Sequence, residues 1–449
     1  MMSQEQNDLI TRIGPGRPAG DVLRRYWMPA ALSKELEANR PVIPVRLLGE
    51  DLALFRDAAT GKLGLVARHC PHRGADMCYG RVEDGGIRCV FHGWLYGTNG
   101  QCLEQPGEPA GSTMHERVQI KSYPVVEKNG IVWAYMGPGE APPFPAFDCF
   151  VAPDTHVFAF KGWWECNWLQ ALEVGIDPAH ASFLHRFLED EDTKDSYGKQ
   201  FRAAAADTNV PLTQLLRENP APELKVEETE YGLRIIALRD LPNGQRHVRV
   251  TNQVFPCAIH IPMSNEMTIT QWHVPIDDEN CYWYAMFTSF TDPVDKQKMW
   301  DQRIKEHTLP DYRPVRNKSN EYGFDPAEQA STTYTGMGMD INVHDQWACE
   351  SMGPIQDRTD EHLSTTDAAI VRYRRMLRGA IKKLADNEDD LPMNVTPEKA
   401  LEIRGPVALD AIAPQDDWET VWLERDAARR EASPWKSSPS KSSPGKAAS

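Results

Sequence analysis

The sequence predicts an α+β protein with two domains that each contain an antiparallel sheet. Short strand-like segments separated by Gly, Asp and Asn fill the region from about residue 43 to residue 136. Longer segments with alternating apolar and polar residues follow between residues 225 and 290. Helical segments near 167–188 and 367–384 add the α component.

The first domain is expected to span residues 41–137, after an N-terminal segment, residues 1–40, that packs on the second domain. Its strands are predicted from the β-rich segments at 43–49, 51–57, 64–70 and 130–137. The Pro- and Gly-rich run at 137–145 indicates a domain boundary, and residues 138–160 are expected to form a linker.

The second domain is expected to span residues 161–430. Its strands are predicted from the alternating segments at 225–240, 247–255, 267–274 and 281–290. Asp292 and Pro293 predict the start of a helix, with Asp as N-cap and Pro in the first helical position. Residues 189–223 are polar and irregular, which predicts a long surface segment. The Ser-, Pro- and Lys-rich end, residues 431–449, is predicted to be disordered.

The charge argues against two classes of partner. Lys and Arg number 49 and Asp and Glu 65, a net charge of −16, whereas nucleic acids and anionic membranes favour basic surfaces. No apolar run approaches the roughly 20 residues of a membrane span, and the N-terminus has no visible export signal. Nine cysteines are too sparse for a disulfide framework. The expected location is the reducing cytoplasm.

The segment from residue 70 to residue 97 contains two pairs of metal-binding side chains. Cys70 and His72 form the first pair, and Cys89 and His92 form the second. A structural zinc site usually opens with two nearby cysteines, whereas here each pair combines one cysteine with one histidine. Such pairs suit a two-iron cluster in which one iron takes both thiolates and the other both imidazoles, which is the Rieske arrangement. The sequence therefore predicts a Rieske [2Fe-2S] cluster, with a structural zinc site as the alternative.

A second, mononuclear iron site is predicted around His180 and His185. Two histidines and one carboxylate on one face of an iron form the triad of O₂-activating non-haem Fe(II) sites. The two histidines are five residues apart, about 140° around a regular helix. Both reach one ion only if the helix is irregular, which Pro178 makes plausible.

The third ligand must be a distant carboxylate. Asp345 is favoured because it stands at an expected helix start with apolar residues behind it, so its side chain can project inward. The other candidates are Asp340, Asp357 and Asp360.

These motifs resemble those of the Rieske non-haem iron aromatic-ring oxygenases, catalytic α subunits, and in particular the phthalate-dioxygenase-like group. The resemblance extends from about residue 8 to residue 425. It is carried by the segments GPGRPAGDVLRRYWMPAAL, CPHRGADM, CVFHGW, NWLQALEVGIDPAHASFLH and ESMGPIQDRTDEHLSTTDAAIVRYRR. It implies a Rieske domain followed by a helix-grip, START-like catalytic domain with a curved antiparallel sheet around the iron. It also implies a homotrimer or hexamer in which the cluster of one subunit lies close to the iron of the next.

The resemblance assigns roles to individual residues. It favours Asp345 as the third iron ligand. Asp177 matches the family's bridging aspartate, which would hydrogen-bond His180 of its own chain and a cluster histidine, His72 or His92, of the next. Arg249 falls where relatives hold a substrate carboxylate with an arginine, and Arg217 is a second candidate.

The implied function is that of the terminal oxygenase of a multicomponent system, using O₂ and NADH-derived electrons to hydroxylate an aromatic carboxylic acid such as a phthalate or benzoate. The chain has no dinucleotide-binding fingerprint, so electrons are expected from a separate NAD(P)H-dependent reductase of the flavin or ferredoxin type. One alternative is O-demethylation of a methoxylated lignin-derived aromatic acid. Another is a Rieske electron carrier without catalysis.

Overall fold

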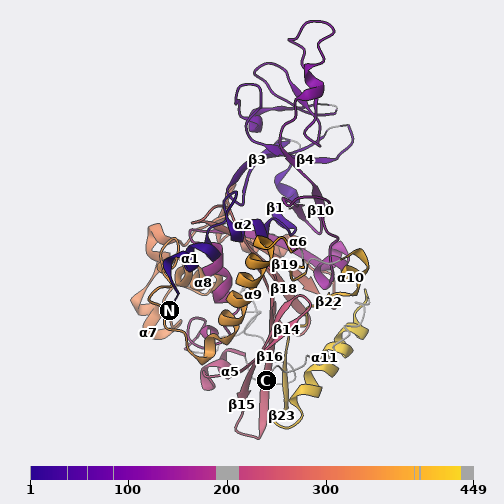
Figure 1. The fold of residues 1–449 in the computed structure, drawn as a ribbon. Helices are drawn as coiled ribbons and strands as arrows, with labels where there is room; N and C mark the ends of the chain where they lie inside the picture. The colour runs from indigo at the N-terminus through magenta and orange to yellow at the C-terminus, as the bar shows by residue number, and fades with distance from the viewer. Residues whose placement is uncertain are drawn as a thin grey trace.

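The computed structural model describes residues 2–435, apart from 38, 58, 84, 189–211, 389 and 394–395. Most of the surface segment predicted at 189–223, and most of the predicted tail at 431–449, therefore lie outside the described residues. The chain forms a smaller upper lobe and a larger lower lobe (Figure 1).

The upper lobe contains two four-stranded antiparallel sheets, with strand orders β2-β3-β4-β9 and β5-β6-β7-β8. The first consists of β2 (Val42–Leu47), β3 (Glu50–Arg56), β4 (Leu63–Ala67) and β9 (Ser122–Tyr123). The second consists of β5 (Arg81–Glu83), β6 (Gly86–Arg88), β7 (Leu95–Tyr96) and β8 (Cys102–Glu104). The short helices η2 (Met77–Tyr79) and η3 (Met114–Arg117) complete this lobe.

A three-stranded sheet, in the order β1-β11-β10, lies between the two lobes (Figure 1). Its strands are β1 (Met28–Leu32), β10 (Val125–Lys128) and β11 (Ile131–Ala134). The N-terminal helices α1 (Gln4–Thr11) and α2 (Pro18–Leu23) lead into it and pack on the lower lobe. Ser3 caps α1 and Pro18 occupies its preferred place in the first turn of α2.

The lower lobe is built on an eight-stranded antiparallel sheet in the order β13-β19-β18-β17-β16-β15-β14, with β23 pairing β16. Its strands are β13 (Val157–Trp164), β14 (Glu223–Thr229), β15 (Gly232–Asp240), β16 (Gln245–Val254), β17 (Ala258–Pro262), β18 (Met267–Pro275), β19 (Cys281–Ser289) and β23 (Leu409–Pro414). In this register Arg249 of β16 stands opposite Ala237 on one side and Asp410 on the other.

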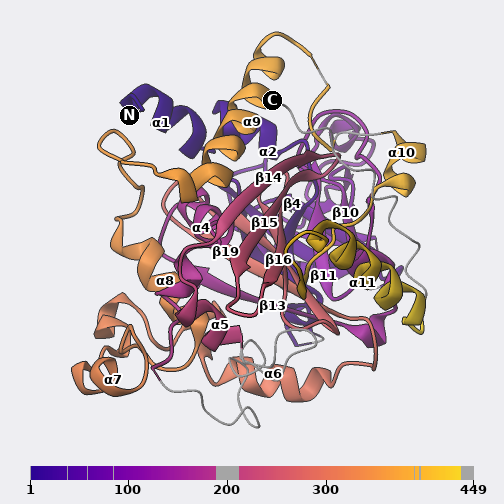
Figure 2. The same ribbon diagram turned by 90° about the horizontal axis from the view of Figure 1, so that it is seen from below.

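Helices cover both faces of this sheet, which Figure 2 shows from below. One face carries α4 (Trp168–Gly175), α8 (Ile341–Ser351) and the long helix α9 (Ala368–Ala385), whose Tyr373 and Leu377 join the main core with Leu233 and Ile235 of β15. The other face carries α11 (Trp418–Ala432), whose two tryptophans pack on Ile236, Leu238, Val248 and Val250. Side chains that alternate along β15 and β16 therefore point into two separate apolar layers, one on each face of the sheet.

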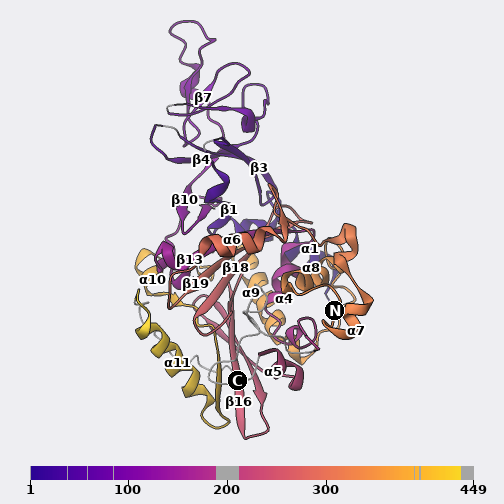
Figure 3. The ribbon, with the colours of Figure 1, turned by 180° about the vertical axis from the view of Figure 1, so that it is seen from behind.

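Shorter elements connect these layers, and Figure 3 shows α6, which packs on β13. They are η1 (Ser33–Glu35), β12 (Ala146–Phe147), α3 (Asp148–Val151), η4 (Asp154–His156), η5 (His180–Ser182), α5 (Leu212–Glu218), α6 (Lys296–Ile304), β20 (His307–Thr308), β21 (Arg313–Pro314), η7 (Lys318–Gly323), α7 (Pro326–Ser331), η8 (Thr365–Asp367), α10 (Pro397–Glu402) and β22 (Arg404–Gly405).

The predicted α+β class is confirmed, including a long helix packed on an antiparallel sheet, but three local predictions are wrong. The segment at 225–240 forms two strands, because the chain turns between Thr229 and Gly232. The helix expected from Asp292 begins at Lys296, because Asp295 is the residue whose side chain accepts from a first-turn amide. The helix expected at 167–188 ends at Gly175.

Candidate metal centres and the cavity beside them

Two loops with the same backbone design carry the predicted cluster residues. The carbonyl of Cys70 accepts from Gly74 N–H, and the amide of Cys70 donates to Ala75. In the second loop, Cys89 makes the equivalent bonds with Gly93 and Trp94. Both glycines are left-handed, with φ of 75° and 76°, a conformation that favours glycine. The two tight turns thus aim their side chains at the same place.

The four side chains between these turns suit a two-iron cluster. Cys70 and Cys89 are buried, and the rings of His72 and His92 have centroids 4.4 Å apart. Trp94 stacks on His72 at 4.3 Å, and Tyr96 Oη lies 3.3 Å from Cys70 Sγ. His72 Nδ1 is buried without a hydrogen-bond partner. A buried imidazole nitrogen with a free lone pair is costly unless it binds something, so the donor set fits a cluster held by two thiolates and two imidazoles.

Three further donor atoms meet in the lower lobe. Asp345 Oδ1 lies 3.2 Å from His185 Nε2 and 3.7 Å from His180 Nε2, and the two Nε2 atoms are 3.2 Å apart. Three ligands at right angles, each about 2.1 Å from one ion, would be separated by roughly 3.0 Å. Asp345 Oδ1 is also buried without a hydrogen bond. The three residues therefore fit one facially bound metal ion.

The break in the chain after α4 explains how two histidines five residues apart reach one point. Helix α4 ends at Gly175, before Pro178, which would interrupt its hydrogen bonds. The chain resumes as the short helix η5, which contains His180, and His185 follows it in a turn. The expected irregular helix is thus a complete break, and the 140° separation of a regular helix does not apply.

Asp177 fixes the orientation of His180 through its backbone. The carbonyl of Asp177 accepts from His180 Nδ1, which leaves Nε2 free to bind metal. The carboxylate accepts from the amide of Ala179 at 2.7 Å, and its other oxygen lies 4.0 Å from His180 Nδ1. Burial lowers the pKa of His180, and His185 lowers it further, which favours the neutral imidazole that a metal needs.

The other carboxylates near Asp345 have different surroundings. Asp340 caps α8 through the amide of Asn342 and forms an ion pair with Arg303 at 3.2 Å. Asp357 and Asp360 are exposed. Helix α8 begins at Ile341, so the expectation that Asp345 stands at a helix start is wrong, and Asp345 lies in the second turn. Burial raises the pKa of Asp345, but the nearby histidines outweigh this, so the pKa lies below its usual range.

A cavity of about 110 Å³ adjoins the three donor atoms. Its walls include Trp164, Ile259, Ile261, Ile269 and Trp283, and its polar lining includes Arg249, Thr251, Gln271, His273 and Asn342. Arg249 is not free within it, because its Nη1 lies 2.5 Å from Asp410 Oδ2 and its Nη2 donates to the carbonyl of Pro262.

The sequence analysis missed Arg239 and Asp410, which lie beside Arg249. Arg239, His247, Arg249 and Asp410 project from the same face of the sheet, because directly opposed residues of antiparallel strands share a face. Burial and the nearby Arg249 lower the pKa of Arg239 to about 10, so it remains cationic at neutral pH. Its Nη2 donates to Pro178 and its Nη1 is buried without a partner. A signal existed for Arg239, which stands an even number of residues from His247 and Arg249 along two neighbouring strands, but none existed for Asp410 on β23.

Arg217 lies elsewhere. It belongs to α5, where its Nη1 donates to the carbonyl of Phe187 at 2.9 Å. The neighbouring Leu216, not Arg217, lines the cavity.

A wider groove of about 1040 Å³ opens on the other side of His180 and Asp177. Its lining includes several exposed apolar side chains, namely Phe183, Phe324, Tyr334, Trp347, Met352 and Leu363.

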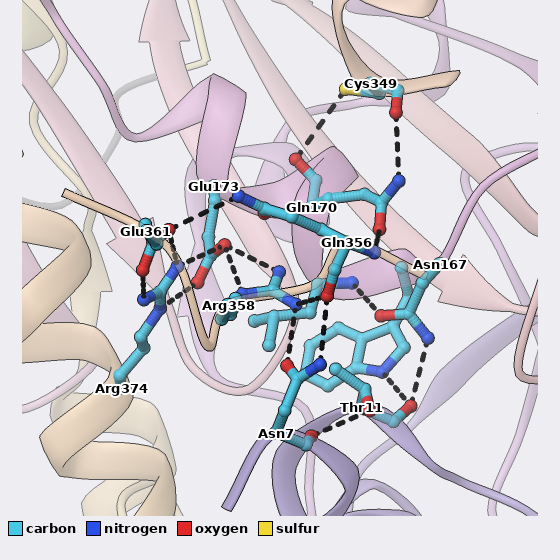
Figure 4. Close-up of polar contacts among 12 residues, drawn as sticks. Asn7, Thr11, Asn167, Gln170, Glu173, Cys349, Gln356, Arg358, Glu361 and Arg374 are labelled. Atoms are coloured by element: carbon cyan, nitrogen blue, oxygen red, sulfur yellow. Dashed lines mark hydrogen bonds and ion pairs between the residues drawn. The ribbon is translucent and has the colours of Figure 1, made fainter. Parts of the chain in front are cut away.

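A buried ionic network supports α4 beneath this groove (Figure 4). Glu173 accepts from Arg358 at 2.8 Å and from Arg374 at 2.5 Å, and Arg374 also contacts Glu361. Arg358 reaches Asn7 of α1 at 3.2 Å. The network thus joins α1 and α9 to α4, the helix that precedes the segment with the two histidines.

Comparison with known proteins identifies the family. A family described as "Rieske [2Fe-2S] domain" matches residues 26–124, and one described as "LigXa C-terminal domain like" matches residues 134–437. The chain belongs to the Rieske non-haem iron oxygenases. One relative of this oxygenase is the oxygenase subunit of phthalate 4,5-dioxygenase from Pseudomonas putida, 35% identical over 95% of this chain and 97% of the relative.

A second relative belongs to the same comparison, and one solved structure shows the same fold. The oxygenase subunit of 5,5′-dehydrodivanillate O-demethylase from Sphingobium is 32% identical over 87% of this chain and 82% of its own. The solved structure of NdmA from Pseudomonas putida CBB5 with caffeine shares the fold, with a TM-score of 0.54 at 17% identity over 81% of this chain and 93% of that one.

The Rieske oxygenase is therefore an oxidoreductase with a [2Fe-2S] cluster and a mononuclear non-haem iron, as predicted. This excludes the electron-carrier and zinc alternatives. As an oxygenase subunit, it works with a separate reductase or ferredoxin. Among the residues that the structure describes, no helix is both long and apolar enough to cross a membrane.

Proposed function

We propose that this oxygenase hydroxylates an aromatic carboxylic acid of the phthalate or benzoate kind, with NADH-derived electrons from a flavin- or ferredoxin-type reductase. The observation that carries the proposal is the guanidinium of Arg249 in the wall of the cavity that adjoins His180, His185 and Asp345. The similarity to a phthalate dioxygenase subunit supports the same substrate class.

Each set of residues has a distinct role in this proposal. Cys70, His72, Cys89 and His92 hold the cluster, and His180, His185 and Asp345 hold the iron. When bound, the cluster supplies single electrons and the iron binds O₂ beside the substrate. The apolar walls of the cavity exclude water and position one ring carbon near the iron.

The charges around Arg249 favour an anionic substrate. Arg249 lines the cavity and pairs with Asp410, and the cationic Arg239 lies on the same sheet face; Arg239 and Asp410 are not part of the cavity lining. Burial lowers the pKa of His247, which contacts Asp410 at 2.9 Å, so this histidine is neutral. Two guanidinium groups and one carboxylate leave one positive charge, which a substrate carboxylate would balance.

The test is Arg249→Ala, compared with Arg246→Ala on the same strand but the opposite face. Oxygen uptake is first screened across phthalates, benzoates and methoxylated biphenyl acids. Loss of a charged partner in a dry pocket should raise KM for the acid about 100-fold, or about 2.7 kcal/mol. KM for the matching carboxamide should change far less, and Arg246→Ala should alter neither value. A KM for the acid within twofold of the wild type would disprove the role of Arg249.

O-demethylation of a methoxylated aromatic acid is the second candidate, favoured by the similarity to the dehydrodivanillate O-demethylase subunit. The product distinguishes the two reactions. Release of one formaldehyde per O₂ from a methoxylated acid indicates demethylation, whereas ring hydroxylation releases none.

We also propose that the oxygenase forms a head-to-tail homotrimer, or a hexamer of two trimers. The cluster loops expose Tyr79, Val90 and Phe91, with 75%, 59% and 54% of their surfaces accessible. The groove lined by Asp177 and His180 exposes a second apolar surface. Docking one subunit's cluster loops into the next subunit's groove would bury both surfaces and bring His72 or His92 to Asp177.

Coexpression of two inactive variants tests this arrangement. His92→Ala should lack an intact cluster and Asp345→Ala should lack the iron, so neither turns over alone. Mixed oligomers should recover a measurable fraction of wild-type turnover if the two sites combine across subunits. No recovery in purified mixed oligomers, or full activity of a wild-type monomer, would refute the arrangement.

A further inference from the structure

We propose that His344 is a positioning residue that fixes the tautomer of His185 and thereby directs the Nε2 lone pair of His185 at the iron. This inference rests on the proposed iron ligands and extends them by a residue for which the sequence analysis gave no role. His344 lies in α8, one residue before Asp345, and is fully buried.

The backbone partner of His344 shows which of its two ring nitrogens carries the hydrogen. His344 Nε2 lies 2.9 Å from the carbonyl oxygen of Gly338. A carbonyl can only accept, so Nε2 carries the hydrogen. A buried imidazole that meets only a carbonyl and another imidazole is neutral and has one N–H. His344 Nδ1 therefore presents a lone pair.

The tautomer of His185 follows in turn. His185 Nδ1 lies 3.5 Å from His344 Nδ1, and the two ring planes differ by 24° with centroids 5.7 Å apart, so the rings meet edge to edge. Because His344 Nδ1 is an acceptor, His185 Nδ1 must be the donor. His185 Nε2 is then unprotonated, where it faces Asp345 Oδ1 and His180 Nε2. In the opposite tautomer, two lone pairs would face each other and an N–H would occupy the metal position.

The loop before α8 is shaped to present the Gly338 carbonyl. Gly336 and Gly338 have φ of 68° and 82°, in the left-handed region where side chains are disfavoured. A Cβ on Gly338 would also lie 1.8 Å from Arg316 Nη1. Two hydrogen bonds, from His344 to the Gly338 carbonyl and from His185 to His344, thus connect a fixed backbone carbonyl to the proposed metal site.

The experiment compares two amide substitutions of His344 in the full-length protein. In His344→Asn the amide oxygen can accept where Nδ1 did. In His344→Gln the longer amide can reach Gly338 but leaves no acceptor beside His185. Ferrous iron affinity, measured against a chelator, should fall 10- to 100-fold in His344→Gln and stay within about threefold of wild type in His344→Asn. The nitric oxide complex of ferrous His344→Gln at saturating iron should give an altered electron paramagnetic resonance spectrum. The Rieske absorption serves as the folding control.

Gly338→Ala provides an independent arm, because it displaces the carbonyl without touching either histidine, and it should weaken iron binding as His344→Gln does. Wild-type iron affinity in both variants would overturn the role of His344. The role would also be overturned if His344→Asn and His344→Gln lost the same amount of iron affinity while Gly338→Ala kept the wild-type affinity. His185→Ala and Asp345→Ala separate this from the parent proposal, because retention of iron by those variants would refute the ligand assignment itself.

Discussion

At the scale of single residues, the partners of each carboxylate decide what it can do. Asp340 and Asp345 are five residues apart in one segment, and both carry a depressed pKa despite burial. Asp340 uses its oxygens on a helix cap and on Arg303. Asp345 keeps one buried oxygen without a hydrogen bond, facing two imidazole nitrogens. Only the second arrangement has a lone pair left for a metal.

Substitution of these two aspartates should therefore give different results. Asp345→Ala should remove about one iron per chain and abolish turnover, while the Rieske absorption persists. Asp340→Ala should keep the iron but lower the free energy of unfolding by about 3 kcal/mol or more, because it leaves Arg303 buried without its carboxylate. Iron analysis, visible absorption and chemical denaturation measure these outcomes. Iron loss in Asp340→Ala with retention in Asp345→Ala would show that the ligand was misassigned.

The sequence predicted the residue types of the site better than their surroundings. Local spacing was enough to single out Cys70, His72, Cys89 and His92 as candidates, because they come from two similar loops. His180 and His185 were favoured only in combination with that upstream motif. The preference for Asp345 over Asp340 depends on Arg303, which no spacing rule connects to residue 340. Asp410 was missed for the same reason, since it meets Arg249 only through the pairing of β16 with β23.

At the scale of elements, α4 is held by charge as well as by apolar packing. Its Glu173 is buried against Arg358 and Arg374, and burial alone would raise the pKa of this carboxyl. The two arginines reverse that effect and keep the pKa below its usual range. Removing one partner from such a network leaves an uncompensated buried charge.

Arg374 and Arg375 of α9 form a matched pair for testing this point. Arg374 is buried against Glu173 and Glu361, whereas Arg375 is exposed. Arg374→Ala should reduce the free energy of unfolding by about 3–5 kcal/mol, and Arg375→Ala should change it by no more than about 0.5 kcal/mol. Urea denaturation followed by circular dichroism measures both. Equal effects of the two substitutions would mean that the network contributes nothing specific.

Helix prediction succeeded where one periodicity dominated. Helix α9 was expected at 367–384 and spans Ala368–Ala385, because its apolar residues repeat at helical spacing over its whole length. The segment at 167–188 has the same helical appearance, but Pro178 cannot continue the helix, and the helix ends at Gly175. Before α6, both Asp292-Pro293 and Asp295 resemble helix starts. Only the side chain of Asp295 accepts a hydrogen bond from an amide of the first turn.

At the scale of the whole molecule, buried neutral histidines are distributed across the lower lobe. His260 and His273 lie on β17 and β18, and His307 lies on β20. Burial lowers the pKa of each of these three to about 3. Each is therefore neutral in the folded protein at neutral pH, and protonating it costs stability.

This predicts a loss of stability in mild acid. An unfolded histidine has a pKa of about 6.5, so between pH 6.5 and 3 the unfolded chain binds protons that the folded chain does not. Stability is complete above about pH 6.5 and falls as the pH decreases, by about 1.4 kcal/mol per unit for each histidine and roughly 4 kcal/mol per unit for all three. Denaturation midpoints between pH 7.5 and 5 measure the slope.

A matched pair of variants controls that slope. His260→Gln should reduce it by about 1.4 kcal/mol per pH unit, whereas His362→Gln, at an exposed position, should leave it unchanged. A midpoint that does not vary between pH 6.5 and 5 would contradict the expected protonation linkage.

The fold class followed from the sequence, whereas the assembly of its largest sheet did not. Strands β14, β15, β16, β18 and β19 lie in segments that alternation predicted, whereas β13 and β17 were not predicted. The insertion of β23 beside β16 brings together residues about 160 positions apart, and it is decided by which apolar faces fit α11. Such long-range pairing leaves no local trace in the sequence.

The positions of the three proposed iron ligands have a consequence for the lifetime of the protein. His185 and Asp345 are 160 residues apart in sequence, so an ion between them acts as a removable cross-link between two distant parts of the chain. A ligand at 100 times its dissociation constant stabilises the folded state by about 2.7 kcal/mol. Protein made under iron starvation would lack this cross-link and should be degraded sooner by proteases, so that cells would accumulate the oxygenase only when iron is available for it.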